Sequence, residues 1–132
     1  MKESNNCDNV IQCTLHVCTS CRPAGFPREP KNDRPGFLLH QELERLIDKR
    51  NLEKKISLRA TECLSLCPRP CGVAFSAPGA WTYLFGDQDA LKTAEDILEC
   101  ALIYVEEPAG YMPREKRPTQ LKSSILGRVP PS

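Results

Sequence analysis

Four short segments of the chain are each predicted to be a β-strand, two from the alternation of apolar and polar residues and two from short apolar runs. Residues 11–17 place apolar side chains on one side and polar ones on the other, the period-two pattern of a half-buried strand, and residues 56–61 repeat it. The apolar runs 73–75 and 81–85 enclose the five residues Ser76-Ala-Pro-Gly-Ala, a connection typical of an antiparallel hairpin.

Two further segments carry apolar residues at helical spacing. Residues 37–50 and 91–105 each form one apolar stripe with polar residues on the other face, which predicts amphipathic helices. Asp87 is a candidate N-cap for the second helix, which should end before Pro108. The predicted order is β-α-β-β-β-α, an α/β domain.

The chain divides into three parts by composition. Residues 1–10 are polar and predicted to be flexible, residues 11–105 form the α/β domain, and residues 106–132 are a proline-rich basic tail that is either draped over the domain or disordered. The cations of the tail are Arg114, Lys116, Arg117, Lys122 and Arg128.

Composition narrows the possible partners. The net charge of +1 provides no overall field to attract nucleic acid or an anionic membrane. The amino-terminal residues lack the apolar core of a secretory signal, and no apolar run is long enough to span a bilayer. We therefore expect a cytoplasmic protein with neither nucleic acid nor membrane as partner.

Cysteine is the residue type that defines the chemistry. Five of the eight cysteines fall into two clusters, Cys18 with Cys21 and Cys63 with Cys67 and Cys71. In a reducing compartment clustered cysteines are metal ligands or redox-active thiols more often than disulfides. Each cluster directly follows a predicted strand, and if those strands are parallel neighbours their carboxyl ends share one edge of the sheet. Two clusters therefore predict one shared site of four thiolates.

The remaining cysteines and the two histidines are predicted to lie outside this site. Cys13 is on the apolar side of the first strand and Cys100 is within the second helix, so both are expected to be small buried core residues. Cys7 lies in the polar amino-terminal segment, and His16 and His40 are expected to be surface or structural residues.

Three chemistries compete for the clustered cysteines. A [2Fe-2S] cluster would carry one electron, whereas a four-thiolate zinc site would be structural or would serve a metal carrier. A dithiol catalyst at Cys18 and Cys21 is the third, although thioredoxin opens a helix at its motif and here a proline-rich loop follows Cys21. We expect no enzyme, because the chain contains no catalytic triad, phosphate-binding loop or nucleotide fingerprint.

The arrangement of residues 14–105 resembles the thioredoxin-like [2Fe-2S] ferredoxins. A cysteine closes the first strand, an amphipathic helix follows, and Cys63-x3-Cys67 leads through Pro78-Gly-Ala-Trp81 to a closing helix. Details such as Cys18-x2-Cys21-Arg and the ending Arg128-Val-Pro-Pro are similar to a bacterial family of small cysteine-rich proteins described only as metal-binding.

The resemblance implies a thioredoxin-like fold, a homodimer and a [2Fe-2S] cluster used for electron transfer or redox sensing with a partner protein. It matches Cys18, Cys63 and Cys67 to three cluster ligands, but the ferredoxins place their second cysteine well downstream of the first. The preferred ligand set is Cys18, Cys21, Cys63 and Cys67, with Cys71 as a substitute ligand or a neighbour that tunes the site.

Overall fold

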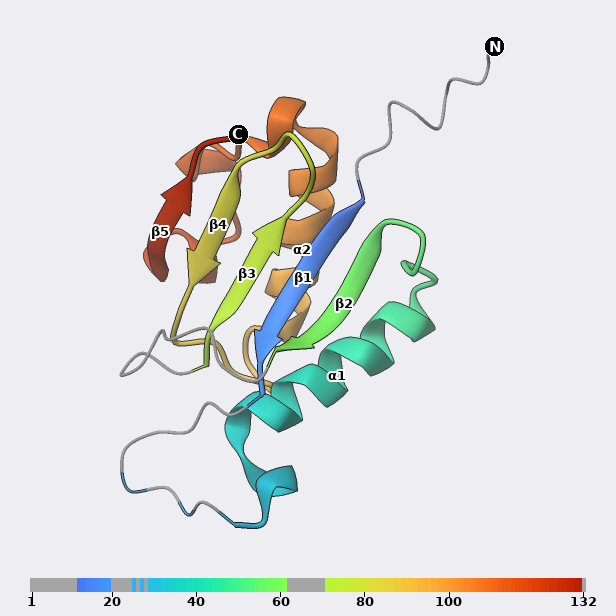
Figure 1. The fold of residues 1–132 in the computed structure, drawn as a ribbon, viewed down its shortest axis with the longest axis vertical. Coiled ribbons are helices and arrows are strands. Elements are labelled where there is room, and N and C mark those ends of the chain that lie inside the picture. Colours follow the sequence, from blue (N-terminus) through green and yellow to red (C-terminus); the bar gives the residue numbers. More distant parts are fainter. Residues whose placement is uncertain (1–11, 20–24, 26, 28, 62–70, 132) are drawn as a thin grey trace.

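The computed structural model describes residues 12–19, 25, 27, 29–61 and 71–131 of the chain (Figure 1). The main elements are β1 (Cys13–Cys18), α1 (Pro35–Lys49), β2 (Ile56–Thr61), β3 (Val73–Ser76), β4 (Thr82–Phe85), α2 (Ala94–Glu106) and β5 (Ile125–Val129). Four short 3-10 helices accompany them: η2 (Lys31–Asp33), η3 (Pro108–Gly110), η4 (Arg114–Lys116) and η5 (Thr119–Leu121). The predicted β-α-β-β-β-α order is confirmed, and a fifth strand is added to it.

The strands form one mixed sheet in the order β2-β1-β3-β4-β5. β1 and β2 are parallel, as predicted, and pair Cys18 with Thr61 at their ends. β3 runs antiparallel to β1 and forms the predicted hairpin with β4. β1 and β2 therefore end, and β3 begins, along the lower edge of the sheet in Figure 1. We call this edge the cysteine edge, because Cys18 closes β1 there and Cys71 lies just before β3.

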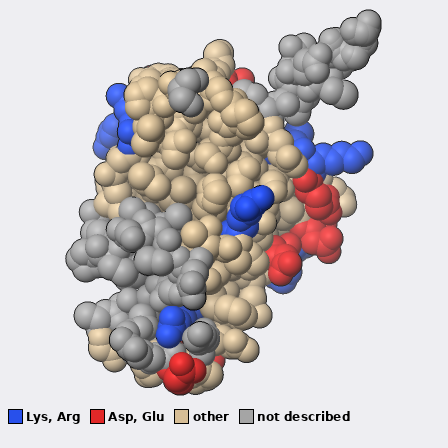
Figure 2. Space-filling view, in the orientation of Figure 1, with Lys and Arg blue, Asp and Glu red and all other residues tan. Residues whose placement is uncertain are grey.

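Both helices contact β1 and each other, which places them together on one face of the sheet. The alternation along β1 explains this packing, since Cys13, Leu15 and Val17 are buried while Thr14 and His16 on the other side are only partly covered. Figure 2 shows the opposite face as mainly uncharged, with charged side chains gathered on the side of α1 and β2. Among the described residues, no helix is long and apolar enough to cross a membrane.

The termini of the helices have local causes. α1 begins with Pro35 at its first turn, where the missing N–H costs nothing. It ends in a Schellman motif, because Asn51 takes a left-handed φ of 55° and Leu52 N–H donates to the Ile47 carbonyl at 3.0 Å. The predicted N-cap Asp87 is wrong: α2 begins only at Ala94, after Thr93.

Residues 106–131 pack on the domain and complete its sheet. β5 pairs antiparallel with β4, and the side chains of Met112 and Leu121 are fully buried. The Tyr83 hydroxyl accepts a hydrogen bond from the Met112 N–H at 2.9 Å. Gly110 has a φ of 68° and lies so near the Tyr104 ring that a β-carbon there would be only 2.6 Å from it. The segment expected as a tail therefore contributes core side chains and one strand.

This packing predicts a large loss of stability from one substitution in the segment. Leu121→Ala removes a fully buried side chain and should lower the free energy of unfolding by about 2–5 kcal/mol. Leu91→Ala is the matched control, because Leu91, expected in the apolar stripe of the second helix, is 94% exposed and its loss should change stability by less than about 0.5 kcal/mol. Urea unfolding measures both, and equal stabilities of the two variants would contradict the packing.

Candidate metal centre

Cys18 lies where hydrogen bonds connect the ends of β1 and β2 with the residues that precede β3. Its side chain is only 2% exposed, and its backbone N–H donates to the Gly72 carbonyl at 3.0 Å. The next residue, Thr19, donates its N–H to the Thr61 carbonyl at 2.8 Å. The ends of β1 and β2 and the residues that enter β3 are therefore joined by hydrogen bonds at the cysteine edge.

Cys71 is the second described thiol at this edge, and its side chain is also 2% exposed. Its backbone bonds to Gln88 in both directions: Cys71 N–H donates to the Gln88 carbonyl at 3.4 Å, and Gln88 N–H donates to the Cys71 carbonyl at 3.2 Å. Burial raises the pKa of Cys71 to about 12, with further contributions from the charges of Asp89 and Cys18. At neutral pH a metal ion would therefore have to displace a proton from this thiol.

The Gln88 side chain is held in turn by the carboxyl-terminal segment. Its Nε2 donates to the Gly86 carbonyl at 2.7 Å and to the Ser124 hydroxyl at 3.1 Å. The Ser124 hydroxyl donates to the Gln120 carbonyl at 2.9 Å, and Gly86 N–H donates to the Ser124 carbonyl at 3.0 Å. We call Gln88, Ser124 and these bonds the glutamine clamp. Neither Gln88 nor Ser124 belongs to a sequence motif, so the sequence alone does not predict this clamp.

A cavity of about 400 Å³ lies beside Cys71 and is lined by polar groups, among them Gln88, Asp89 and Thr93. Pro35, the first residue of α1, also lines it, and Thr93 directly precedes α2. Both helices therefore begin near Cys71. The amino-terminal end of a helix carries a partial positive charge, which favours a negatively charged group such as a thiolate–metal centre.

The other predicted ligands, Cys21, Cys63 and Cys67, lie outside the described residues, as does Cys7. Within the described part of the chain, no three His, Cys, Asp or Glu side chains converge in a way that could hold a metal ion. The structure thus brings Cys18 and Cys71 to one edge of the sheet, and a complete ligand set stays a prediction. The donors present are soft thiols, which fit zinc or iron.

Cys13 and Cys100 are fully buried in the core, as predicted. Cys100 Sγ lies 3.5 Å from Met112 Sδ, and burial raises the pKa of both thiols, that of Cys13 to about 12. These two cysteines therefore act as neutral core residues.

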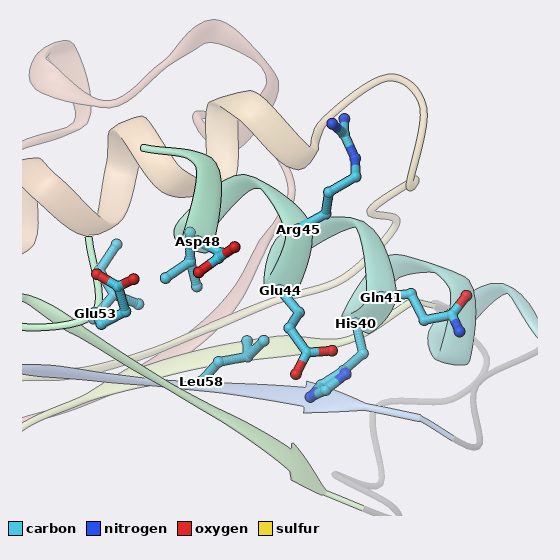
Figure 3. Close-up of a pocket in the computed structure, with 9 residues that line it drawn as sticks. His40, Gln41, Glu44, Arg45, Asp48, Glu53 and Leu58 are labelled. Carbon is cyan, nitrogen blue, oxygen red and sulfur yellow. The ribbon is translucent and has the colours of Figure 1, made fainter. Parts of the chain in front are cut away.

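Neither of the two histidines lines the cavity beside Cys71. His16 Nε2 lies 3.0 Å from the Ser76 hydroxyl, and partial burial lowers its pKa, with a smaller effect from Arg59. His40 lines a groove of about 750 Å³ between α1 and β2, together with Glu44, Asp48 and other residues (Figure 3). None of the four described cysteines lines that groove.

Comparison with solved structures identifies the fold as thioredoxin-like. A thioredoxin-like [2Fe-2S] ferredoxin from Aquifex aeolicus superposes with a TM-score of 0.54 and 16% sequence identity, covering 91% of this chain and 94% of that chain. The model of a family described as "Protein of unknown function (DUF1636)" matches residues 15–131. The chain belongs to this family, and no curated protein matches it. The resemblances drawn from the sequence are thereby confirmed for fold and family.

The raised pKa of Cys13 predicts a loss of stability at alkaline pH. The folded protein keeps this proton up to about pH 12, whereas the unfolded thiol releases it above pH 9.0. The contribution of the protonated Cys13 thiol to the free energy of unfolding is therefore fully present below pH 9.0 and is lost as the pH rises from 9.0 to about 12. At a pH of roughly 10.5 the loss is about 2 kcal/mol. Urea unfolding of metal-free protein at pH values of about 8 and 10.5 measures the decline. In Cys13→Ala it should be smaller by about that amount, and an equal decline in both proteins would contradict the prediction.

Proposed function

We propose that this protein binds a [2Fe-2S] cluster at the cysteine edge and serves in one-electron transfer or redox sensing. Four of the five clustered cysteines, Cys18, Cys21, Cys63, Cys67 and Cys71, would hold it. Bound there, the cluster would supply a reversible one-electron couple. The observation that carries the proposal is the pair of buried thiols at Cys18 and Cys71, set at one edge of a sheet whose fold is that of a thioredoxin-like ferredoxin.

Chain connectivity supports the proposal for the other cysteines. Cys21 follows Thr19 by two residues and Cys63 follows Thr61 by two residues. Two extended residues span at most about 7 Å. Thr19 and Thr61 are joined by a hydrogen bond of 2.8 Å at the cysteine edge, so each cluster starts from an anchor beside Cys18. Four thiolates are the number that a [2Fe-2S] cluster needs.

The positions of the helices favour a metal centre over a dithiol catalyst, although the carboxylate of Asp89 beside Cys71 opposes negative charge there and a bound cation would have to offset it. The beginnings of α1 and α2 supply partial positive charge near Cys71. A dithiol catalyst instead needs a helix that begins at its cysteine pair, because that helix end lowers the thiol pKa. α1 begins at Pro35, well after Cys21 in the chain.

The proposal requires a second protein that donates or accepts the electron, and by resemblance to the ferredoxins it includes a homodimer. The five cations of the carboxyl-terminal segment are not all available to dock such a partner, because Arg117 is buried and Arg128 lies over Trp81, 4.9 Å from the ring centroid. Light scattering on purified protein should give the mass of two chains, and the mass of one chain would remove the dimer from the proposal.

Metal analysis tests the proposal directly. Protein purified without oxygen or chelators should be coloured and contain about two irons and two sulfides per chain. Its visible bands should bleach with dithionite, and the reduced protein should give an electron paramagnetic resonance signal. Cys18→Ser should lose most of the iron, because it removes a buried ligand at the cysteine edge.

Cys7→Ser is the matched control, since it removes a thiol outside both clusters and should keep the wild-type spectrum. A colourless wild-type protein with one zinc per chain would overturn the cluster and leave a structural or metal-carrier module. A wild-type protein without iron or zinc would overturn every metal reading.

A further inference from the structure

We propose that Cys71 is one of the four thiolates that hold the metal centre, and that Gln88 is the residue that fixes its position. This inference rests on the proposed function and deepens it. It makes Cys21 the dispensable member of the five clustered cysteines, because Cys63, Cys67 and Cys71 belong to one segment and with Cys18 already supply the four thiolates of the site. It also makes the carboxyl-terminal segment part of the support of the metal.

The surroundings of Cys71 differ from those of the core cysteines. Cys100 packs in the apolar core against the sulfur of Met112. Cys71 belongs to the same core cluster, but it also borders a polar cavity lined by Asp89, Lys92 and Thr93. A thiol that served only for packing would not need a polar cavity beside it, whereas a ligand needs room on one side for the metal.

The backbone around Cys71 is held from both sides. Gly72 accepts the N–H of Cys18 at 3.0 Å, and Cys71 exchanges two hydrogen bonds with Gln88. The two described thiols are thus attached to backbone segments that are hydrogen-bonded to each other. A ligand pair held in this way loses little conformational freedom when it binds a metal.

The position of Gln88 depends on its own amide. The Nε2 group bonds to Gly86 and to Ser124, so the side chain anchors the same turn whose backbone bonds to Cys71. Gln88 is 4% exposed, and among the described residues its Oε1 has no hydrogen-bond partner. Loss of the two Nε2 bonds would let the turn move, and Cys71 would move with it.

Cysteine substitutions test the ligand assignment. Cys71→Ser and Cys21→Ser are loaded anaerobically and compared with wild type by visible spectrum and by iron, sulfide and zinc per chain. We expect Cys21→Ser to keep the wild-type spectrum and metal content, and Cys71→Ser to lose most of its metal. Circular dichroism of both variants checks that each is folded.

Several outcomes separate this inference from the proposed function. Wild-type metal and spectrum in Cys71→Ser would overturn the inference and leave the cluster in place, as would loss of metal in Cys21→Ser. A zinc-loaded wild type would overturn the cluster, but the same two variants would still decide the ligand by their zinc content. A wild type without any metal would overturn both.

Gln88→Met tests the positioning role, because it keeps the side-chain length and removes both Nε2 bonds. We expect the loaded variant to lose its metal to a chelator about tenfold faster than wild type, with a shifted visible spectrum and reduction potential. Gln41→Met is the matched control on an exposed part of α1.

Substitutions of Ser124 test the other end of the clamp. Ser124→Thr should behave as wild type because it keeps the hydroxyl. In Ser124→Ala the chelator rate, visible spectrum and reduction potential should change in the same direction as in Gln88→Met. If Gln88→Met is less stable but has the wild-type spectrum, potential and chelator rate, Gln88 supports the fold and does not position Cys71.

Discussion

The hydrogen bond from Cys18 N–H to the Gly72 carbonyl is the constraint on which the rest of the cysteine edge depends. It continues the antiparallel pairing of β1 with β3, in which Val17 lies opposite Val73. A slip of one residue in that pairing would turn each side chain of a strand to the other face of the sheet. Buried Leu15 and Phe75 would then lose the core, so the apolar pattern that stabilises the sheet also fixes where Cys18 and Cys71 meet.

Support for this edge comes from parts of the chain far apart in sequence. Cys18 belongs to β1, Cys71 precedes β3, and the glutamine clamp connects the turn after β4 with Ser124 just before β5. A metal bound to the folded edge would therefore stabilise the carboxyl-terminal segment along with the thiols, because anything that binds only the native state shifts the folding equilibrium towards it. In the proposed metal-bound state, order in residues 106–131 and occupancy of the site would be physically linked.

Local periodicity was enough to predict most of the fold. The alternation in β1 and β2 and the apolar stripe of α1 predicted elements within a few residues of those observed. β1 and α1 bury one side against the core, whereas β2 buries only Ile56 fully and Leu58 in part. β5 escaped prediction, since Ile125–Val129 includes Gly127 and Arg128 and shows no alternation. Leu91 matched the helical spacing but precedes the first residue of α2, so it never reaches the core.

The candidate site was predictable only in part, because local sequence patterns do not show contacts between distant parts of the chain. Cysteine spacing in the sequence identifies thiols that can act together. It carries no information on Gln88 and Ser124, because these two residues meet only when the carboxyl-terminal segment packs beside the turn after β4.

The spacing of the cysteines in the sequence fits metal binding and dithiol catalysis equally well. The surroundings of each thiol distinguish between the two. Cys13 and Cys71 both have a pKa raised to about 12 by burial, so neither is a reactive thiolate at neutral pH. Both thiols lie among core side chains, but Cys71 also lies beside a polar cavity near the beginnings of both helices. A neutral buried thiol is a poor nucleophile for disulfide exchange. A metal ion that binds there replaces the thiol proton, and its positive charge stabilises the buried thiolate. Burial of Cys71 therefore weighs against dithiol catalysis by this residue and is compatible with a thiolate–metal bond.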